Sequence, residues 1–267
     1  MLPSNDHRPK TRFAAFCYDV KHYPKRPIIL SEGDSWFSYP TRKNIIDHIQ
    51  KMGKFDLYRL EKSGDEILEI MSGKQKRKLR RLFIKYPVDL ILFSGGGNDI
   101  TSEDLFSLLK DRSKVNSWED AINKKRFYRR LQHIKNAYLD LIDLRDDYRE
   151  TCTIMTHGYD YPIPSDVGAK LFGYKVSGPW MKPYMEQNNI TSKVEQKHIA
   201  KWLIQHFDDM LIDLESKTNN FIHIKTTGTL NAEDWGDELH PTSAGFEKIA
   251  NKFKPELKRL FPNTVIR

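Results

Sequence analysis

The sequence lacks several features that would place it in a specialised structural class. It has only two cysteines in 267 residues, Cys17 and Cys152, which offers neither a disulfide framework nor the spacing of a metal site. We expect two free, partly buried thiols. No apolar run approaches the roughly 20 residues of a membrane-spanning helix. Internal repeats and low-complexity tracts are also missing, so the sequence is typical of an ordinary globular protein.

The amino-terminal residues and the charge give weaker expectations. Residues 1–13, MLPSNDHRPKTRF, are polar and lack the apolar centre of a secretory signal. A cytoplasmic protein is the simplest expectation, although a secreted chain whose signal had been removed would have the same pattern. The formal net charge of +8 permits an anionic partner without requiring one. The length suits one large α/β domain or two small ones.

Five short segments, each bounded by turn residues, are candidates for strands. They are residues 27–32, 55–60, 88–94, 152–157 and 221–227. The third is almost continuously apolar, a pattern typical of a parallel strand that is covered on both faces.

Apolar residues with helical spacing occur between these segments. They predict helices over residues 45–52, 67 to about 83, 131–144, 193–214, and from Ser243 to about Leu260. The residues Ser192 and Glu195 have the spacing of a capping box at the start of the fourth helix. This alternation of strands and helices predicts a parallel sheet with helices on both faces.

Residues 160–189 stand out as an irregular segment that is rich in proline, glycine and aromatic residues. Long loops in compact domains are often functional. The segment follows the fourth predicted strand, so we expect it at the carboxyl edge of the sheet, where ligands bind in open α/β sheets.

Residue types that can carry chemistry follow the predicted strands. Residues 33–35 (GDS) end the first strand, 63–65 (SGD) the second and 96–99 (GGND) the third, while 237–246 (DELHPTSAGF) lie near the carboxyl terminus. The ends of parallel strands meet at one edge of a sheet. That edge would therefore hold a hydroxyl, backbone donors, a carboxamide, and an acid with an imidazole.

Serine hydrolysis needs these groups. The attacking hydroxyl must lose its proton to a base within hydrogen-bond reach, and the base needs an acceptor that orients it. Preorganised N–H donors must meet the charge that develops on the carbonyl oxygen. The three-residue spacing of Asp237 and His240 lets one local turn present the carboxylate and the imidazole together, although Glu233, Asp234 and Glu238 are other acids nearby.

The four blocks resemble, in order, those of the SGNH (GDSL-type) hydrolases, a family of esterases, lipases and acyl hydrolases. The match spans the region from Ser35 to about Ala250. The resemblance implies a three-layer α/β/α fold with a flavodoxin-like, five-stranded parallel sheet of strand order 2-1-3-4-5. It also implies one SGNH-hydrolase-like domain over residues 1–267, with residues 160–189 as an insertion, and no metal or organic cofactor.

The resemblance also assigns roles to individual residues. Ser35 is implied to be the nucleophile, His240 the base and Asp237 the acid that orients the base. The implied oxyanion donors are the backbone N–H groups of Ser35 and Gly64 and the side-chain amide of Asn98. The expected reaction is hydrolysis of a carboxylic ester through an acyl-enzyme. Acyl transfer to another hydroxyl and a non-catalytic binding module with a basic face are the alternatives.

The sequence departs from the family pattern in two places. An asparagine often precedes the glycine of the second block, but Ser63 stands here. Trp36 and Phe37 follow the implied nucleophile where aliphatic residues are usual, and we expect them to shape a pocket wall. Asp34 is expected to bond locally and hold the turn.

Other residues are candidates for the substrate pocket. The full set of candidates is Trp36, Phe37, His157, Tyr159, Tyr161 and Trp180. For His157 a structural role, bonded to a backbone carbonyl, is an equal alternative. The run Gly95–Gly97 does not fit the dinucleotide-binding fingerprint, so we expect no nucleotide.

Two basic runs, residues 74–81 and 123–130, account for much of the positive charge. Both lie in helical patterns, so we interpret them as solvated helix faces and expect no nucleic-acid partner. The expected partner is a small-molecule, lipid or sugar ester, and the oligomeric state stays open.

Overall fold

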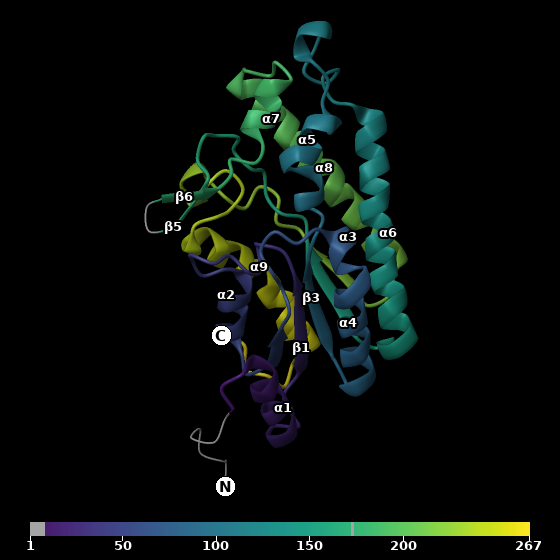
Figure 1. The fold of residues 1–267 in the computed structure, drawn as a ribbon. Coiled ribbons are helices and arrows are strands. Elements are labelled where there is room, and N and C mark those ends of the chain that lie inside the picture. Colours follow the sequence, from purple (N-terminus) through teal and green to yellow (C-terminus); the bar gives the residue numbers. More distant parts are fainter. Residues whose placement is uncertain (1–8, 172–173) are drawn as a thin grey trace.

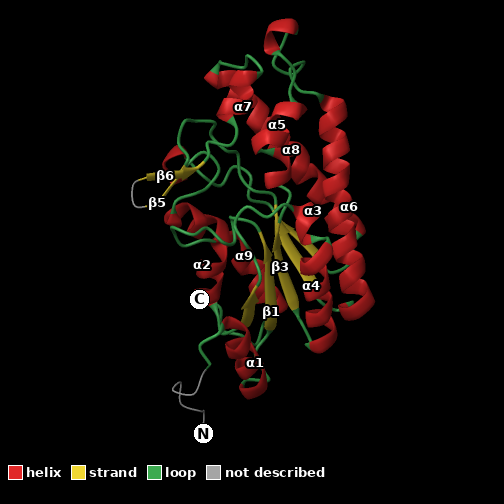
Figure 2. Cartoon of the chain, in the orientation of Figure 1, coloured by secondary structure: helices red, strands yellow, loops and turns green. Residues whose placement is uncertain are grey.

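A parallel sheet forms the centre of the computed structural model, which describes residues 9–171 and 174–267. Helices cover both faces of this sheet (Figures 1 and 2). Its strands are β1 (Ile28–Gly33), β2 (Asp56–Arg59), β3 (Leu90–Ser94), β4 (Thr153–His157) and β7 (Phe221–Ile224), in the order β2-β1-β3-β4-β7. All neighbouring strands in it are parallel. This confirms the predicted order 2-1-3-4-5, because β7 is the fifth strand of this sheet.

The burial of the three central strands accounts for their apolar sequences. Every residue of β1, β3 and β4 is buried. Helices cover both faces of these strands, so residues that point either way along them avoid water. The edge strand β2 alternates between buried and half-buried residues instead, which fits its alternating sequence.

The helices form two groups. On one side of the sheet α2 (Ile45–Met52) packs against α9 (Ser243–Leu260). The second group contains α3 (Ile67–Ile70), α4 (Gly73–Lys85), α6 (Lys124–Arg149) and α8 (Lys193–Lys217) (Figure 1). The helix α9 has the bounds that its sequence pattern predicts, and α6 extends well beyond the predicted core of residues 131–144.

Polar side chains fix where the helices begin. Asn44 and Asp47 form a full capping box at the start of α2, and the hydroxyl of Thr242 accepts from the N–H of Gly245 at the start of α9. Ser192 accepts from the N–H of Glu195 before α8, as its spacing predicts. Each such bond satisfies a backbone donor that has no partner within its helix.

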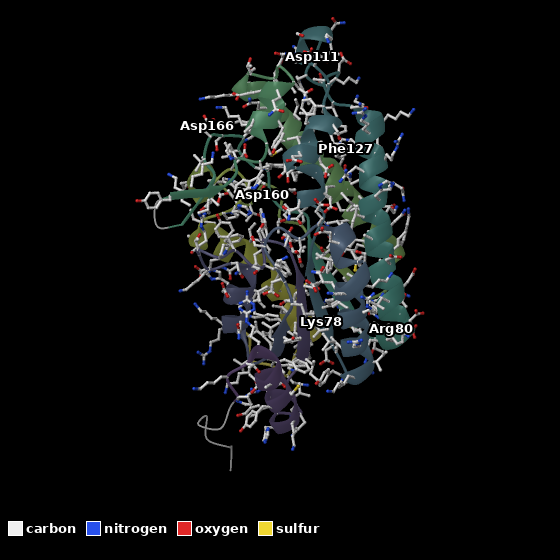
Figure 3. The ribbon with its side chains drawn as sticks, in the orientation of Figure 1. Lys78, Arg80, Asp111, Phe127, Asp160 and Asp166 are labelled. Carbon is white, nitrogen blue, oxygen red and sulfur yellow. The ribbon has the colours of Figure 1, made fainter. Side chains whose placement is uncertain are left out.

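The segment 160–189 contains secondary structure that the sequence did not predict. The strands β5 (Ala169–Leu171) and β6 (Tyr174–Ser177) pair as an antiparallel hairpin, and α7 (Lys182–Gln187) follows. Asp160 and Asp166, labelled in Figure 3, lie beyond the carboxyl ends of the central strands, where this segment was expected. Two further helices, α1 (Arg12–His22) and α5 (Ser102–Leu108), were also not predicted.

The basic runs lie on helices α4 and α6, and their apolar members face the core. Leu79, Leu82, Phe83 and Phe127 are buried, while Lys78 and Arg80 project from α4 (Figure 3). Both cysteines are free, as expected. In the described part of the chain, no helix combines the length and the apolar character needed to cross a membrane.

Gly33, at the end of β1, is a position where the fold requires glycine. Its φ of +149° is unfavourable for other residues, and a Cβ there would lie 2.3 Å from the carbonyl oxygen of Ser94. We predict that Gly33→Ala lowers the free energy of unfolding by about 3 kcal/mol, because it adds a steric clash to backbone strain. Urea unfolding measures this.

Gly228→Ala is the matched control. Gly228 also has a positive φ, +75°, but a Cβ there would have no atom within 4 Å, so only the strain of about 1 kcal/mol applies. Equal destabilisation by the two substitutions would show that the contact with Ser94 is unimportant.

Candidate active site

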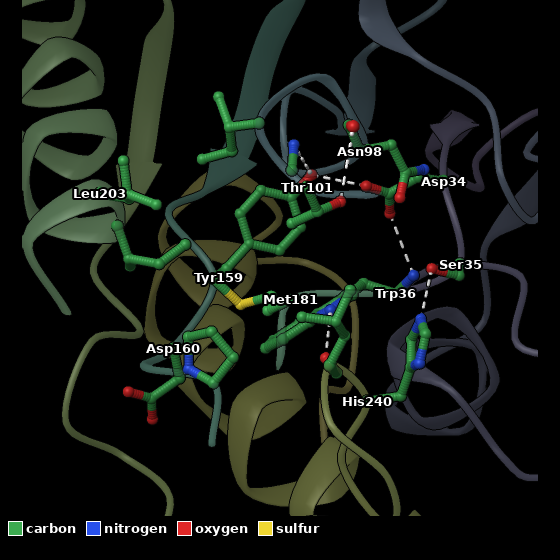
Figure 4. Close-up of a pocket in the computed structure, with 15 residues that line it drawn as sticks. Asp34, Ser35, Trp36, Asn98, Thr101, Tyr159, Asp160, Met181, Leu203 and His240 are labelled. Atoms are coloured by element: carbon green, nitrogen blue, oxygen red, sulfur yellow. Dashed lines mark hydrogen bonds between the residues drawn. The ribbon is translucent and has the colours of Figure 1, made fainter. Parts of the chain in front are cut away.

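Ser35 lies in a tight turn directly after β1. The carbonyl oxygen of Asp34 accepts hydrogen bonds from the N–H groups of Phe37 (3.2 Å) and Ser38 (3.0 Å), which closes the turn. The Ser35 side chain is largely buried, with 6% of the residue exposed. Its Oγ lies 2.7 Å from Nε2 of His240 (Figure 4). A strand end and a turn more than 200 residues later in the chain therefore meet at this hydroxyl.

The imidazole of His240 is held by an acid from its own turn. Oδ1 of Asp237 lies 2.8 Å from Nδ1 of His240 and also accepts from the backbone N–H groups of Leu239 (3.1 Å) and His240 (2.8 Å). A carboxylate at this place requires the proton on Nδ1, so Nε2 is left to accept from the hydroxyl of Ser35. This is the geometry of a base that is aimed at a nucleophile.

Two residues that the sequence analysis missed hold the other oxygen of Asp237. The hydroxyl of Tyr39 donates to Oδ2 at 2.7 Å, and Nη2 of Arg42 lies 3.6 Å from the same atom. Burial raises the pKa of Asp237, but the hydrogen bonds and charge of His240 and the bond from Tyr39 outweigh it, so the pKa is lowered. The carboxylate therefore stays ionised. No local pattern marks Tyr39 or Arg42, because they contact Asp237 only in the folded chain.

Three N–H donors lie at or near this site: Asn98 lines the cavity that contains Ser35, and Gly64 lines an adjoining cleft together with Asn98. Within the described residues, the N–H groups of Ser35 and Gly64 donate to no acceptor. Gly64 has a φ of +89° that favours glycine. Nδ2 of Asn98 donates one hydrogen to the carbonyl of Asp65 at 2.9 Å, which fixes the amide and leaves its second hydrogen available. These three groups are suited to an oxyanion.

The carboxylate of Asp34 ties three strand ends together. Oδ1 accepts from the N–H of Trp36 (3.0 Å) and the hydroxyl of Ser94 (2.7 Å), and Oδ2 accepts from the hydroxyl of Tyr159 (2.5 Å). The same Tyr159 oxygen accepts from the N–H of Gly97 at 3.1 Å. Burial raises the pKa of Asp34, although these hydrogen bonds act to lower it. The expected local bond is thus one part of a wider network that supports the turn of Ser35.

His157 belongs to this network as a buried neutral side chain. Its Nδ1 accepts from the N–H of Tyr159 (3.2 Å), so Nε2 carries the proton and donates to Oγ of Ser94 (3.0 Å). Burial lowers the pKa of His157 to about 3. The structure thus gives His157 a structural place, although its partners differ from the backbone carbonyl considered above.

Of the pocket candidates, Trp36, Tyr159 and Trp180 lie beside Ser35 or His240. Trp36 and Tyr159 line a narrow cavity with Ser35 and His240 (Figure 4). Trp180 lines a wider neighbouring cleft, and its ring packs edge-on against that of His240, with centroids 5.1 Å apart.

The other three candidates lie elsewhere. Phe37 and His157 are fully buried and line neither space, because they pack into the core beneath the turn, with ring centroids 5.5 Å apart. Tyr161 lines a separate surface groove. We therefore leave these three out of the pocket that we propose.

Glu238, which follows the acid of the turn, has a different function from its neighbour. It is fully buried and accepts backbone N–H bonds from Ser165 (3.1 Å), Met181 (2.8 Å), Lys182 (2.8 Å) and Trp180. Burial raises its pKa, while these bonds oppose the change. Glu238 thus anchors the segment 160–189 to the turn that carries the candidate base.

No protein-family model matches the sequence, and no curated protein matches it either. Solved structures do match. A lipase from a goat rumen metagenome shares 20% identity over 86% of this chain and 96% of its own, with a TM-score of 0.59. An extracellular lipase from Streptomyces rimosus shares 11% over 84% of this chain and 98% of its own, with a TM-score of 0.53.

A candidate GDSL-like lipase from Bacteroides ovatus shares 11% identity over 91% of this chain, with a TM-score of 0.54, and this chain spans 55% of its length. At such low sequence identities, the structural similarity establishes the fold alone. The protein has the SGNH hydrolase fold, the α/β fold of GDSL-like lipases and esterases, as the four sequence blocks predicted. In the described part of the chain, no three His, Cys, Asp or Glu side chains gather so as to hold a metal ion.

Glu32, two residues before Asp34, makes the stability of the folded protein depend on pH. It is 2% exposed, and its Oε1 accepts from the N–H of Gly33 at 3.0 Å. Burial, with the nearby charges of Glu61 and Asp65, raises its pKa from 4.5 to about 8, although the bond from Gly33 opposes this. In that range of pH the folded state keeps the proton that the unfolded state loses, so rising pH favours unfolding.

We predict that Glu32→Gln weakens this pH dependence. Between pH 5 and pH 8 the wild type should lose up to about 1.4 kcal/mol of unfolding free energy per pH unit from this group. The amide cannot ionise but can still accept from Gly33. Urea unfolding at several pH values measures the slope, with the exposed Glu119→Gln as control. Identical slopes in wild type and Glu32→Gln would contradict the prediction.

Proposed function

We propose that this protein is a serine esterase that hydrolyses carboxylic esters through an acyl-enzyme on Ser35. The observation that carries the proposal is the chain of two hydrogen bonds from Ser35 through His240 to Asp237, at 2.7 and 2.8 Å. The uncommitted N–H donors beside it supply the other requirement of acyl transfer. The shared fold of lipases and esterases is consistent with this activity but does not by itself define it.

In the first half of the reaction, Oγ of Ser35 attacks the carbonyl carbon of the ester. Its proton passes to Nε2 of His240, and Asp237 stabilises the imidazolium that forms. The charge that develops on the carbonyl oxygen is met by the N–H groups of Ser35 and Gly64 and by the amide of Asn98. The tetrahedral intermediate then breaks its bond to the alcohol oxygen, which takes the proton from His240.

In the second half, water attacks the acyl-enzyme. His240 takes a proton from the water, and the same donors hold the second tetrahedral intermediate. When its bond to Oγ breaks, His240 returns the proton to Ser35 and the carboxylic acid leaves. Tyr39 and Arg42 hold the carboxylate of Asp237 in place throughout, so they act as positioning residues.

Ser35→Ala should abolish hydrolysis of p-nitrophenyl acetate while leaving the thermal unfolding curve nearly unchanged. The substitution removes the proposed nucleophile, and the fold loses only one hydroxyl that lines a cavity. Initial rates measured by release of p-nitrophenol test this. Ser38→Ala, in the same turn, is the matched control and should retain activity. Full activity in the Ser35 variant would refute its role.

Asn98→Ala should lower kcat by about 10²–10³, with a smaller change in KM, because the developing charge loses one donor. Steady-state kinetics with the same ester measure both constants, and Asn136→Ala on the exposed face of α6 serves as control. A variant with wild-type kcat would assign Asn98 a purely structural role through its bond to Asp65.

A further inference from the structure

Two spaces of very different size meet at the candidate oxyanion donors. The narrow one, which contains Ser35 and His240, has a volume of about 40 Å³. The wide one has about 570 Å³. Asn98 and Thr101 line both spaces, and Gly64 lines the wide one. An ester whose carbonyl oxygen is held at these donors would therefore extend one of its two sides into each space.

The narrow cavity is lined mainly by apolar side chains. Its apolar lining comes from Ile100, Pro162, Met181, Leu203, Ile204 and Leu239 (Figure 4). A water-sized group needs roughly 10–15 Å³ by this measure, so the cavity has room for about three or four such groups. That is enough for an acetyl or propionyl group and too little for a long alkyl chain, because packed protein interiors yield little.

The wide cleft has the opposite character. Two aromatic rings, Trp180 and Tyr184, line it together with the carboxylates of Glu66 and Glu103 and the hydroxyl of Ser102. Aromatic rings pack against the flat apolar faces of ring-shaped polyols, and carboxylates accept hydrogen bonds from hydroxyl groups. The cleft therefore fits a bulky alcohol that carries several hydroxyl groups.

The charges in the cleft disfavour an anionic alcohol, although the whole chain carries a net charge of +8. The charged residues that line the cleft are Glu66, Glu103 and Asp104. Arg130 binds both carboxylate oxygens of Asp104, at 2.6 and 2.9 Å, whereas the side-chain carboxylates of Glu66 and Glu103 accept no hydrogen bond from a described residue. Burial and the neighbouring Asp104 raise the pKa of Glu66. A further negative charge would meet repulsion here.

We propose that the substrate is a short-chain ester, acetyl-sized, of a bulky and uncharged polyhydroxylated alcohol. The acyl group occupies the narrow cavity and the alcohol occupies the wide cleft. This inference rests on the proposed esterase function and adds to it the substrate class and the orientation of the substrate.

The first test concerns the acyl side. With p-nitrophenyl esters, kcat/KM should fall at least about tenfold from acetate to butyrate and further to octanoate, because each methylene beyond those of a propionyl group overfills the cavity. Leu203→Ala should raise the butyrate-to-acetate ratio about fivefold or more. Leu211→Ala removes a buried leucine from the same helix, outside the cavity, and should leave the ratio unchanged.

An octanoate ester that reacts as fast as acetate would overturn the assignment of the narrow cavity. A Leu203→Ala variant with the wild-type ratio of butyrate to acetate activity would overturn the same assignment. If Leu203→Ala does not fold, Leu203→Val makes the same test with a smaller enlargement of the cavity.

The second test concerns the alcohol side. Acetylated methyl glucoside should react at least about tenfold faster, in kcat/KM, than its acetylated glucuronic acid counterpart, and the double variant Glu66→Gln, Glu103→Gln should narrow this difference. Tyr184→Ala should raise KM for the glucoside more than for p-nitrophenyl acetate. Tyr174→Ala is the control, since Tyr174 is 79% exposed and lines neither space.

Equal rates with the neutral and anionic sugars, or equal effects of the two tyrosine variants, would overturn the assignment of the cleft. The outcomes separate the two proposals. Serine-dependent hydrolysis of p-nitrophenyl acetate with the wrong preferences would refute only the substrate class. If the protein hydrolyses no ester at all, the proposed function and this inference both fail.

Discussion

The buried carboxylate of Asp34 is the group on which the geometry of the candidate site depends. It receives hydrogen bonds from its own turn, from Ser94 at the end of β3 and from Tyr159 after β4, so three neighbouring strand ends are fixed relative to one another. Gly33 allows β1 to approach Ser94 closely enough for this. A buried carboxylate is stable only when its oxygens are satisfied, and here that requirement holds the turn that presents Ser35.

Two further buried carboxylates fix the positions of loops in the same way, by accepting hydrogen bonds from them. Glu238 binds four backbone N–H groups of the segment 160–189. Asp160 accepts from the N–H groups of residues 228–230, at 2.6 to 2.8 Å. The loop after β4, the loop after β7 and the turn of His240 are therefore linked through carboxylates that, among the described residues, accept only from backbone donors. Such bonds depend on the backbone conformation of the bound segments and depend little on which side chains these segments carry.

The sequence predicted the sheet, its strand order and the residues that meet at its edge. The strands could be predicted because most of them are apolar runs bounded by turn residues, and the meeting of their ends because neighbouring parallel strands end at the same edge. The strand order came from the resemblance of the four blocks to the SGNH hydrolases. The sequence could not distinguish Asp237 from Glu238 by spacing alone, since both lie near His240 in the chain. Only the folded turn shows that one carboxylate faces the imidazole and the other faces the segment 160–189.

The residues that the sequence analysis missed or misplaced share a physical cause. Tyr39 and Arg42 contact Asp237 across almost 200 positions, and no local pattern encodes such a contact. Phe37 and His157 lie at strand ends as expected, but their side chains turn into the core. The strands β5 and β6 have only three and four residues, and β6 is exposed along its whole length, so each offers at most the shortest apolar alternation from which a strand is predicted.

The most direct test of the account is to identify the atom that a mechanism-based inhibitor modifies. The intact protein would be treated with a fluorophosphonate at neutral pH, digested, and analysed by peptide mass spectrometry. Among the described residues, only the hydroxyl of Ser35 is hydrogen-bonded to Nε2 of His240, so we expect a single phosphonyl adduct, on Ser35, whose formation is strongly slowed in His240→Ala. An adduct on another residue, or labelling of Ser35 that is as fast without the imidazole, would contradict it.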